Sequence, residues 1–214
     1  MGQMKTNSPE TVFIVDDDAL IRAGLGELLE SAGLATQQFP SAEAFLAAWT
    51  QEMAGCLVLD VRLPGISGMG LQSKLIELGS DLPVIIMTAH GDVPMVRKAL
   101  KSGAVEFLTK PFTDEELLNA VDEAFALDRR RRERDTRSQA FQQRAQSLTE
   151  RERQVMGLVT AGNTNKEIAE RLHLSVVTVK LYRGQVMRKM QAESLADLVK
   201  MVELLANRDA TDAS

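Results

Sequence analysis

Short apolar runs alternate with longer stretches of helical spacing through the first part of the chain, and no other feature restricts the fold as much. The runs lie at Thr11–Val15, Ala35–Phe39, Cys56–Leu59, Pro83–Met87 and Ala104–Leu108. The inner strands of a parallel sheet that helices cover on both faces are continuously apolar, as residues Val12–Val15 and Val84–Met87 are. The alternation therefore predicts an α/β fold, a doubly wound (βα)5 unit with a parallel five-stranded sheet.

Polar side chains follow these runs where the predicted strands end. Asp16-Asp17-Asp18 comes after the first run, Asp60 after the third, Thr88 after the fourth, and Lys110-Pro111 just after the fifth. In doubly wound sheets the functional residues gather at the carboxyl edge, beside the strand where the order reverses. With the common strand order 2-1-3-4-5 the first and third strands are neighbours. We therefore expect Asp16, Asp17 and Asp60 to share one pocket.

Such an acidic pocket needs a compensating charge, because crowded carboxylates are unfavourable unless a cation joins them or one is protonated. Oxygen-only ligands with access to water indicate Mg²⁺ or Mn²⁺. A nucleophilic aspartate, a divalent ion, a hydroxyl and a lysine are what phosphoryl transfer to a carboxylate requires. Taken alone, Asp16–Asp18 would simply cap the helix that begins near Ala19. The polar residues at the other strand ends favour a phosphoryl site.

Residues 11–126 resemble a response-regulator receiver domain, on the strand-end pair Asp16-Asp17 together with Asp60, Thr88 and Lys110-Pro111. The resemblance implies that Asp60 is the phosphoacceptor. It also implies a Mg²⁺ or Mn²⁺ site formed by Asp17, Asp60 and the backbone carbonyl of Arg62, with Asp16 acting mostly through water.

The same resemblance assigns the other pocket residues. Thr88 is the switch hydroxyl, and Phe107 takes the place of the family's rotating aromatic residue. Lys110 pairs with the phosphoryl group, and the Lys110–Pro111 peptide bond is expected to be cis. The segment 88–94 is most similar to FixJ-type regulators, and His90 within it is expected to be a structural loop residue rather than a ligand.

Charge is divided unevenly along the chain. Residues 1–126 contain 8 basic and 18 acidic side chains, residues 127–148 contain 7 and 3, and residues 149–206 contain 9 and 7. The net charge of −5 excludes a polycation that coats nucleic acid indiscriminately. An anion-binding function is therefore expected in the second half of the chain.

The basic segment 127–147 is expected to be a helical linker. It includes the run Arg129–Arg132, and no Pro or Gly interrupts residues 112–156. A solvated helical face explains the arginines best, and direct contact with phosphates is a second explanation. The boundaries predicted from these changes are a receiver domain at 1–126, the linker at 127–147, a helical domain at 148–206 and a disordered tail at 207–214.

The third of these segments has the pattern of compact helices. Thr149 and Thr164 each precede a Glu by three residues, as in a capping box, and Ser175 and Ser194 can cap two further helices. Two short helices joined by a tight turn predict a helix-turn-helix. The helix at 175–190 carries basic residues and no acid. A helical dimerisation module with a solvated basic face is the alternative.

Residues 148–205 resemble the LuxR-type DNA-binding domain, on the motifs Leu148–Glu152, Asn165–Ala169 and Ser175–Lys180. The resemblance implies that one group of side chains faces base edges and another holds phosphates. The base-facing residues are Lys180, Leu181 and Gly184, and the phosphate-binding residues are Thr178, Arg183 and Lys189. Tyr182 and Gly184 depart from the family pattern, which affects the expected DNA sequence.

Together these features resemble two-component response regulators of the NarL/FixJ family. The resemblance implies that a sensor histidine kinase phosphorylates Asp60, and that the phosphorylated chain forms a homodimer on promoter DNA and activates transcription with RNA polymerase. We expect a regulator and not an enzyme. A single cysteine, Cys56, and no apolar run long enough to span a membrane are typical of a cytoplasmic protein.

Three alternatives stay open at this stage. A haloacid-dehalogenase-like phosphohydrolase would use Asp16 as nucleophile and Asp18 as acid and base, but it needs acidic residues after the fourth strand, where this chain has Thr88. A flavodoxin-like FMN protein needs a hydroxyl-rich phosphate loop where Asp16–Asp18 would repel phosphate. A family member that binds DNA without ever being phosphorylated is the third.

Overall fold

The computed structural model of the chain describes residues 10–89, 97, 101 and 103–211. The chain divides into two compact units, Met1–Arg131 and Arg132–Ser214. Each unit has its own hydrophobic core. In the described part of the chain, no helix is long and apolar enough to cross a lipid bilayer.

The first unit is built on one parallel sheet. Its strands are β1 (Thr11–Val15), β2 (Ala35–Phe39), β3 (Gly55–Asp60), β4 (Val84–Thr88) and β5 (Glu106–Thr109). The order is β2-β1-β3-β4-β5, and every neighbouring pair is parallel. Val15 pairs with Leu59, and Thr88 pairs with Thr109. The predicted doubly wound fold is confirmed, and this register brings the carboxyl ends of β1, β3, β4 and β5 to one edge.

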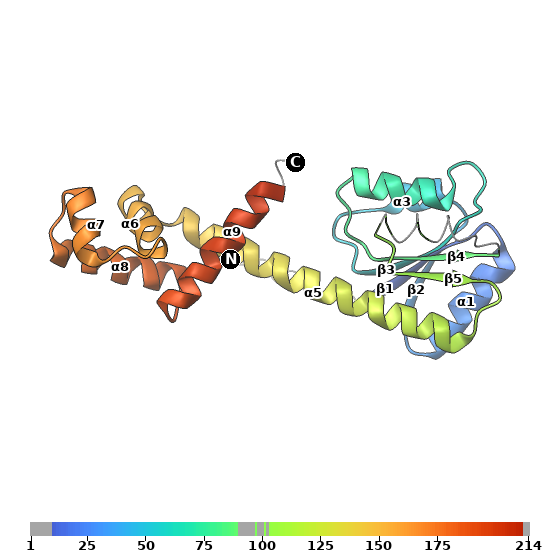
Figure 1. Cartoon of the computed structure of the whole chain (residues 1–214). Coiled ribbons are helices and arrows are strands. Elements are labelled where there is room, and N and C mark those ends of the chain that lie inside the picture. Colours follow the sequence, from blue (N-terminus) through green and yellow to red (C-terminus); the bar gives the residue numbers. More distant parts are fainter. Residues whose placement is uncertain (1–9, 90–96, 98–100, 102, 212–214) are drawn as a thin grey trace. The chain divides into compact units, whose positions relative to one another are not determined.

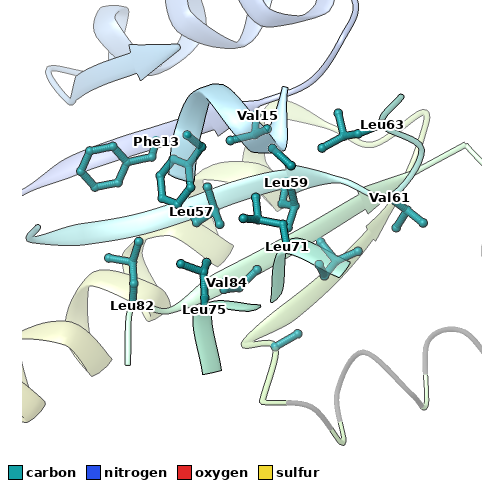
Figure 2. Close-up of a cluster of buried hydrophobic side chains, with 14 residues drawn as sticks. Phe13, Val15, Leu57, Leu59, Val61, Leu63, Leu71, Leu75, Leu82 and Val84 are labelled. Carbon is teal, nitrogen blue, oxygen red and sulfur yellow. The ribbon is translucent and has the colours of Figure 1, made fainter. Parts of the chain in front are cut away.

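Helices cover both faces of the sheet (Figure 1). Among the residues that the structure describes, this unit contains the helices α1 (Ala19–Ser31), α2 (Ala42–Ala48), α3 (Gly68–Glu77) and the first part of α5 (Asp114–Gln146). Because side chains alternate along a strand, Phe13 and Val15 pack with α2 and α3, whereas Val12 and Ile14 pack with α1 and α5. Figure 2 shows the first of these clusters, in which Leu71 and Leu75 of α3 lie against Leu57 and Leu59 of β3.

One member of the acidic run has the structural role that the capping explanation predicted. Asp18 is the N-cap of α1, and its carboxylate accepts hydrogen bonds from the N–H groups of Leu20 at 2.8 Å and Ile21 at 3.3 Å. Capping satisfies backbone donors that have no partner inside the helix. Asp18 therefore caps α1, as the capping explanation predicted for the acidic run.

The segment predicted as a solvated linker is part of α5, which is 33 residues long. The solvated face is correct for the exposed Arg129 and Arg130. It is wrong for Asp128, which is 0% exposed, and for Phe141, which packs in the core of the second unit. The sequence did not reveal this because charged and glutamine residues surround both side chains.

The second unit contains the end of α5 and the helices α6 (Glu150–Thr160), α7 (Asn165–Leu172), α8 (Val176–Met190) and α9 (Leu195–Thr211). Both predicted capping boxes are formed, by Thr149 with Glu152 and by Thr164 with Glu167. Ser175 caps α8 by accepting from the Thr178 N–H at 3.0 Å. The predicted tail begins at residue 207, whereas α9 is helical to Thr211.

Candidate functional site

An ammonium group joins two buried carboxylates at the carboxyl edge of the sheet. Lys110 Nζ donates hydrogen bonds to Asp16 Oδ2 and to Asp60 Oδ1, both at 2.7 Å. Asp16 follows β1, Asp60 ends β3 and Lys110 follows β5. Asp16 is 1% exposed and Asp60 is 7% exposed. The structure thus brings together three residues that are far apart in the sequence. Asp16 and Asp60 lie close together, as the strand-end pattern predicted, and Lys110 joins them.

Backbone amides bind the other oxygens of both carboxylates. Asp16 Oδ1 accepts from the Asp18 N–H at 2.9 Å, and Asp60 Oδ2 accepts from the Arg62 N–H. These contacts fix the orientation of each carboxylate. The main chain of Arg62, the residue expected to supply a carbonyl to the metal, therefore borders the pocket.

Lys110 is charged in this environment. Burial alone would lower the pKa of its ammonium group, but the hydrogen bonds and negative charges of Asp16 and Asp60 outweigh burial and raise that pKa above the ordinary value. One ammonium charge compensates two carboxylates only in part. The pocket therefore remains attractive to a further cation.

The other predicted pocket residues lie in or directly after the strands β1, β4 and β5. Thr88 ends β4 and is buried, and its backbone carbonyl accepts from the Lys110 N–H at 2.7 Å. Phe107 in β5 is partly buried against the core. Asp17 is exposed next to Asp16, and the Lys110–Pro111 peptide bond is cis. The prediction for His90 lies outside the described residues.

The donor set of the pocket suits a hard cation. Carboxylate and carbonyl oxygens are the ligands that Mg²⁺ prefers, and this ion usually keeps several waters. Within residues 10–89, 97, 101 and 103–211, no three His, Cys, Asp or Glu side chains already form a metal-binding cluster. The oxygens of Asp16 and Asp60 that face each other are instead joined by Lys110.

Two residues that the sequence reasoning missed support the pocket. Arg22 in α1 donates from Nη1 to the backbone carbonyl of Asp16 at 2.7 Å. Glu43 in α2 accepts from the Ile66 N–H at 3.0 Å and so holds the loop after Asp60. A cation near the start of a helix, where the helix dipole disfavours it, was a usable signal for Arg22. Nothing local in the sequence relates Glu43 to Ile66.

The second unit presents a distinct face on α8. Three of the predicted DNA-binding residues are exposed on one side of this helix: Lys180, Leu181 and Gly184. Thr178 Oγ1 lies 2.7 Å from Ser175 Oγ at the start of the helix. The opposite side of α8 is buried through Val179, Val186 and Met190.

The other two predicted phosphate ligands are engaged within the protein. Arg183 Nη1 donates to Asn165 Oδ1 at 2.7 Å, which joins α8 to the start of α7. Lys189 Nζ donates to Glu152 Oε2 at 2.6 Å and to the carbonyl of Ser147 at 3.2 Å. The Glu152 carboxylate is buried, and its pKa is lowered. The largest cause is the hydrogen bond from Lys189, and the second is the hydrogen bond from the Thr149 N–H. The structure therefore favours a structural role for Lys189.

Comparison with known proteins identifies both units. Residues 12–122 match the response regulator receiver domain, and residues 146–202 match bacterial regulatory proteins of the luxR family. Nodulation protein W of Bradyrhizobium diazoefficiens is 46% identical over 204 residues, which cover 95% of this chain and 90% of that protein. Transcriptional regulatory protein FixJ of Azorhizobium caulinodans is 45% identical over 204 residues, which cover 95% of this chain and 96% of that protein.

A solved structure shows the same similarity over both units. The response regulator StyR is 46% identical to this chain, with a TM-score of 0.80, and the match covers 92% of this chain and 99% of that one. The receiver pocket, the helix-turn-helix and these full-length similarities agree. The chain belongs to the two-component response regulators of the NarL/FixJ family, in which a receiver domain is joined to a LuxR-type DNA-binding domain.

Proposed function

We propose that phosphorylation of Asp60 controls DNA binding by this response regulator. The observation that supports this proposal best is the Lys110 ammonium group 2.7 Å from both Asp16 and Asp60. The pocket holds a carboxylate nucleophile and a cation that can pair with a phosphoryl group. The proposed donor is a phosphohistidine of a sensor histidine kinase.

In the proposed transfer, an oxygen of the Asp60 carboxylate attacks the phosphorus atom. A new O–P bond forms as the P–N bond to the kinase histidine breaks, and the imidazole nitrogen keeps the electron pair. The product is an acyl phosphate whose phosphoryl group carries a charge of about −1.5 to −2. This charge replaces the single negative charge of the Asp60 carboxylate. Because Lys110 is charged, it can exchange part of its contact with Asp60 for the new phosphoryl oxygens, and the Thr88 hydroxyl can donate to them.

Mg²⁺, or Mn²⁺, is the proposed cofactor of this transfer. Asp17, Asp60 and the carbonyl of Arg62 would hold the ion, and Asp16 would contact it mostly through water. When bound, the ion neutralises charge on the transferred phosphoryl group. Two observations support this assignment: Asp17 is exposed, and the Arg62 N–H binds the Asp60 carboxylate.

The proposed output is transcriptional activation in the cytoplasm. The phosphorylated receiver would form a homodimer, with Thr88 and Phe107 as switch residues. Two α8 helices would then bind half-sites about 34 Å apart, one turn of the duplex. RNA polymerase is the proposed partner at the promoter. We propose a regulator rather than an enzyme, because the phosphoryl group of the kinase is transferred to Asp60 of the protein itself and not to a separate substrate.

Mass spectrometry after incubation with a small phosphodonor and Mg²⁺ tests the proposal. We expect the intact chain to gain one phosphoryl mass, and Asp60→Asn to gain none. Asp18→Asn is the matched control, because this carboxylate caps α1 and lies outside the acceptor pair. A phosphoryl group on Asp16 would favour the phosphohydrolase alternative, and no modification at all would contradict the proposal.

A further inference from the structure

Two large apolar side chains are exposed on α8. Val177 is 77% exposed and Leu181 is 59% exposed. They lie four residues apart, so they occupy the same side of the helix. The exposed residues Lys180, Gly184 and Arg188 continue this side, which we call the α8 stripe, opposite the buried Val179, Val186 and Met190.

The chemistry of the α8 stripe restricts what it can recognise. It contains two basic residues and no acid, which suits a polyanion. A Cβ atom built on Gly184 would meet no atom of the chain within 4 Å, so this position leaves a gap between the flanking side chains. Lys180 is adjacent to Leu181 and three residues from Val177, so a hydrogen-bonding side chain lies next to the two apolar ones on the helix surface. A partner that covers this surface must combine an acceptor with an apolar group.

We propose that Val177 and Leu181 contact the C5-methyl groups of thymine, on either side of a base pair contacted by Lys180. This inference rests on the proposed DNA-binding function. In the major groove thymine is the base that presents a methyl group, and guanine offers acceptors to lysine. Side chains four residues apart are separated by about 5–6 Å. That separation spans roughly one to two base-pair steps of about 3.4 Å.

A second copy of this chain is the competing occupant of the same surface. Lys180 and Arg188 flank the apolar residues, and two such stripes facing each other would bring like charges together. The same two charges favour the phosphates that border the major groove. The charge pattern thus favours duplex DNA.

Replacement of thymine by deoxyuridine tests the inference, because it removes only the methyl group. The full-length protein, treated with phosphodonor and Mg²⁺, is first used to select its preferred duplex from random DNA. Each thymine of that duplex is then replaced in turn and the dissociation constant is measured. We expect binding to weaken about fourfold at one or two positions in each half-site, the effect of about 0.8 kcal/mol for one buried methyl-sized group.

Variants connect each methyl group to its side chain. Val177→Ala and Leu181→Ala should each bind the thymine duplex more weakly and lose the response to deoxyuridine at one position. Val176→Ala is the matched control, because the same side chain one residue earlier points about 100° away around the helix. This control should keep the full response to deoxyuridine.

Each other outcome overturns the inference. A protein that selects a specific duplex but shows no deoxyuridine effect would exclude methyl recognition and leave the proposed function intact. Loss of self-association in Val177→Ala, with unchanged DNA binding, would assign the stripe to a second copy. Failure to select any sequence, in a protein that takes up the phosphoryl group, would contradict DNA recognition itself.

Discussion

The pKa of Lys110 is raised because its ammonium group forms hydrogen bonds and ion pairs with the carboxylates of Asp16 and Asp60. Without this cation the two buried carboxylates would repel each other. A folded-state pKa above the unfolded value means that the contribution to stability is complete at neutral pH. It is lost as the pH rises through the folded-state pKa, above the ordinary value of 10.5. Lys110 is thus a structural cation of the receiver as well as the proposed partner of the phosphoryl group.

Replacing this cation should destabilise the receiver. We expect Lys110→Met to lower the free energy of unfolding by about 2–3 kcal/mol at pH 7, somewhat less than the loss of one partner in a fully buried pair. Urea denaturation at several pH values measures this effect, with Lys74→Met, an exposed lysine of α3, as the control. The difference from the wild type should shrink above pH 10.5. Equal stability of Lys110→Met and the wild type at pH 7 would contradict the pairing.

Lys189 gives a second prediction at the residue scale. Its ammonium group is held by Glu152 and Ser147, so Lys189→Met should lower the melting temperature and leave the salt dependence of DNA binding unchanged. Arg188→Ala, on the exposed side of α8, should instead reduce the salt slope by about 0.9, because one phosphate is then no longer neutralised.

The pair of Glu152 and Lys189 also makes stability depend on pH. The pKa of Glu152 is lowered, so the stabilisation by this pair is complete above pH 4.5 and is lost as the pH falls through the folded-state pKa.

Measurements of the dissociation constant between low and moderate salt separate the two roles. A smaller slope in Lys189→Met would return this residue to the phosphate ligands that the sequence resemblance implies. The resemblance could not reveal the pair, because residues 152 and 189 lie on different helices and their contact depends on the packing of α6 against α8.

At the scale of elements, α5 is attached to the sheet at the edge opposite the pocket. The Asp128 carboxylate accepts from the Gly55 N–H at the start of β3 at 3.0 Å, and from Arg131 at 2.7 Å. Gly55 has a φ of 126°, and a Cβ atom there would lie 2.0 Å from the carbonyl oxygen of Thr11. Asp128 therefore anchors the last receiver turn of α5 at a place where two strands approach closely.

Removal of this anchor leaves a buried donor without its partner. Asp128→Ala should cost the receiver about 1–3 kcal/mol of unfolding free energy, the cost of an unsatisfied buried group. Glu133→Ala, an exposed acid of the same helix, is the control and should change stability little. Hydrogen exchange at the Gly55 amide reports the same contact directly. Unchanged protection of that amide in Asp128→Ala would show that Asp128 does not hold it.

The elements that the sequence predicted well are those with a local signal. The run at Thr11–Val15 coincides with β1, whose apolar and β-branched residues are buried after the first position. The run at Ala35–Phe39 coincides with β2, although this edge strand contains two glutamines and is largely exposed. The run at Ala104–Leu108 begins two residues before β5, because Ala104 and Val105 are apolar without belonging to the strand. Phe141 was missed because its burial depends on contacts with helices that follow it in the sequence.

At the scale of the whole molecule, the chain separates an acidic receiver from a more basic DNA-binding unit. Phosphorylation adds negative charge to a pocket in the first unit, and the α8 stripe lies in the second. Coupling between them requires that the phosphorylated receiver favour the DNA-binding form by differential free energy, typically about 1–3 kcal/mol. The sequence and the family resemblance predict the two coupled sites, the receiver pocket and the DNA-binding helix. They do not predict the coupling free energy, because it depends on how the complete chain responds to phosphorylation.

The dissociation constant for the selected duplex, measured with and without phosphodonor in the presence of Mg²⁺, tests this coupling most directly. For the wild type we expect phosphodonor to tighten binding by about 5- to 150-fold, the range that corresponds to typical coupling free energies. For Asp60→Asn we expect no change. Equal binding by phosphorylated and unphosphorylated wild-type protein, or the same tightening in Asp60→Asn, would contradict control of DNA binding through Asp60.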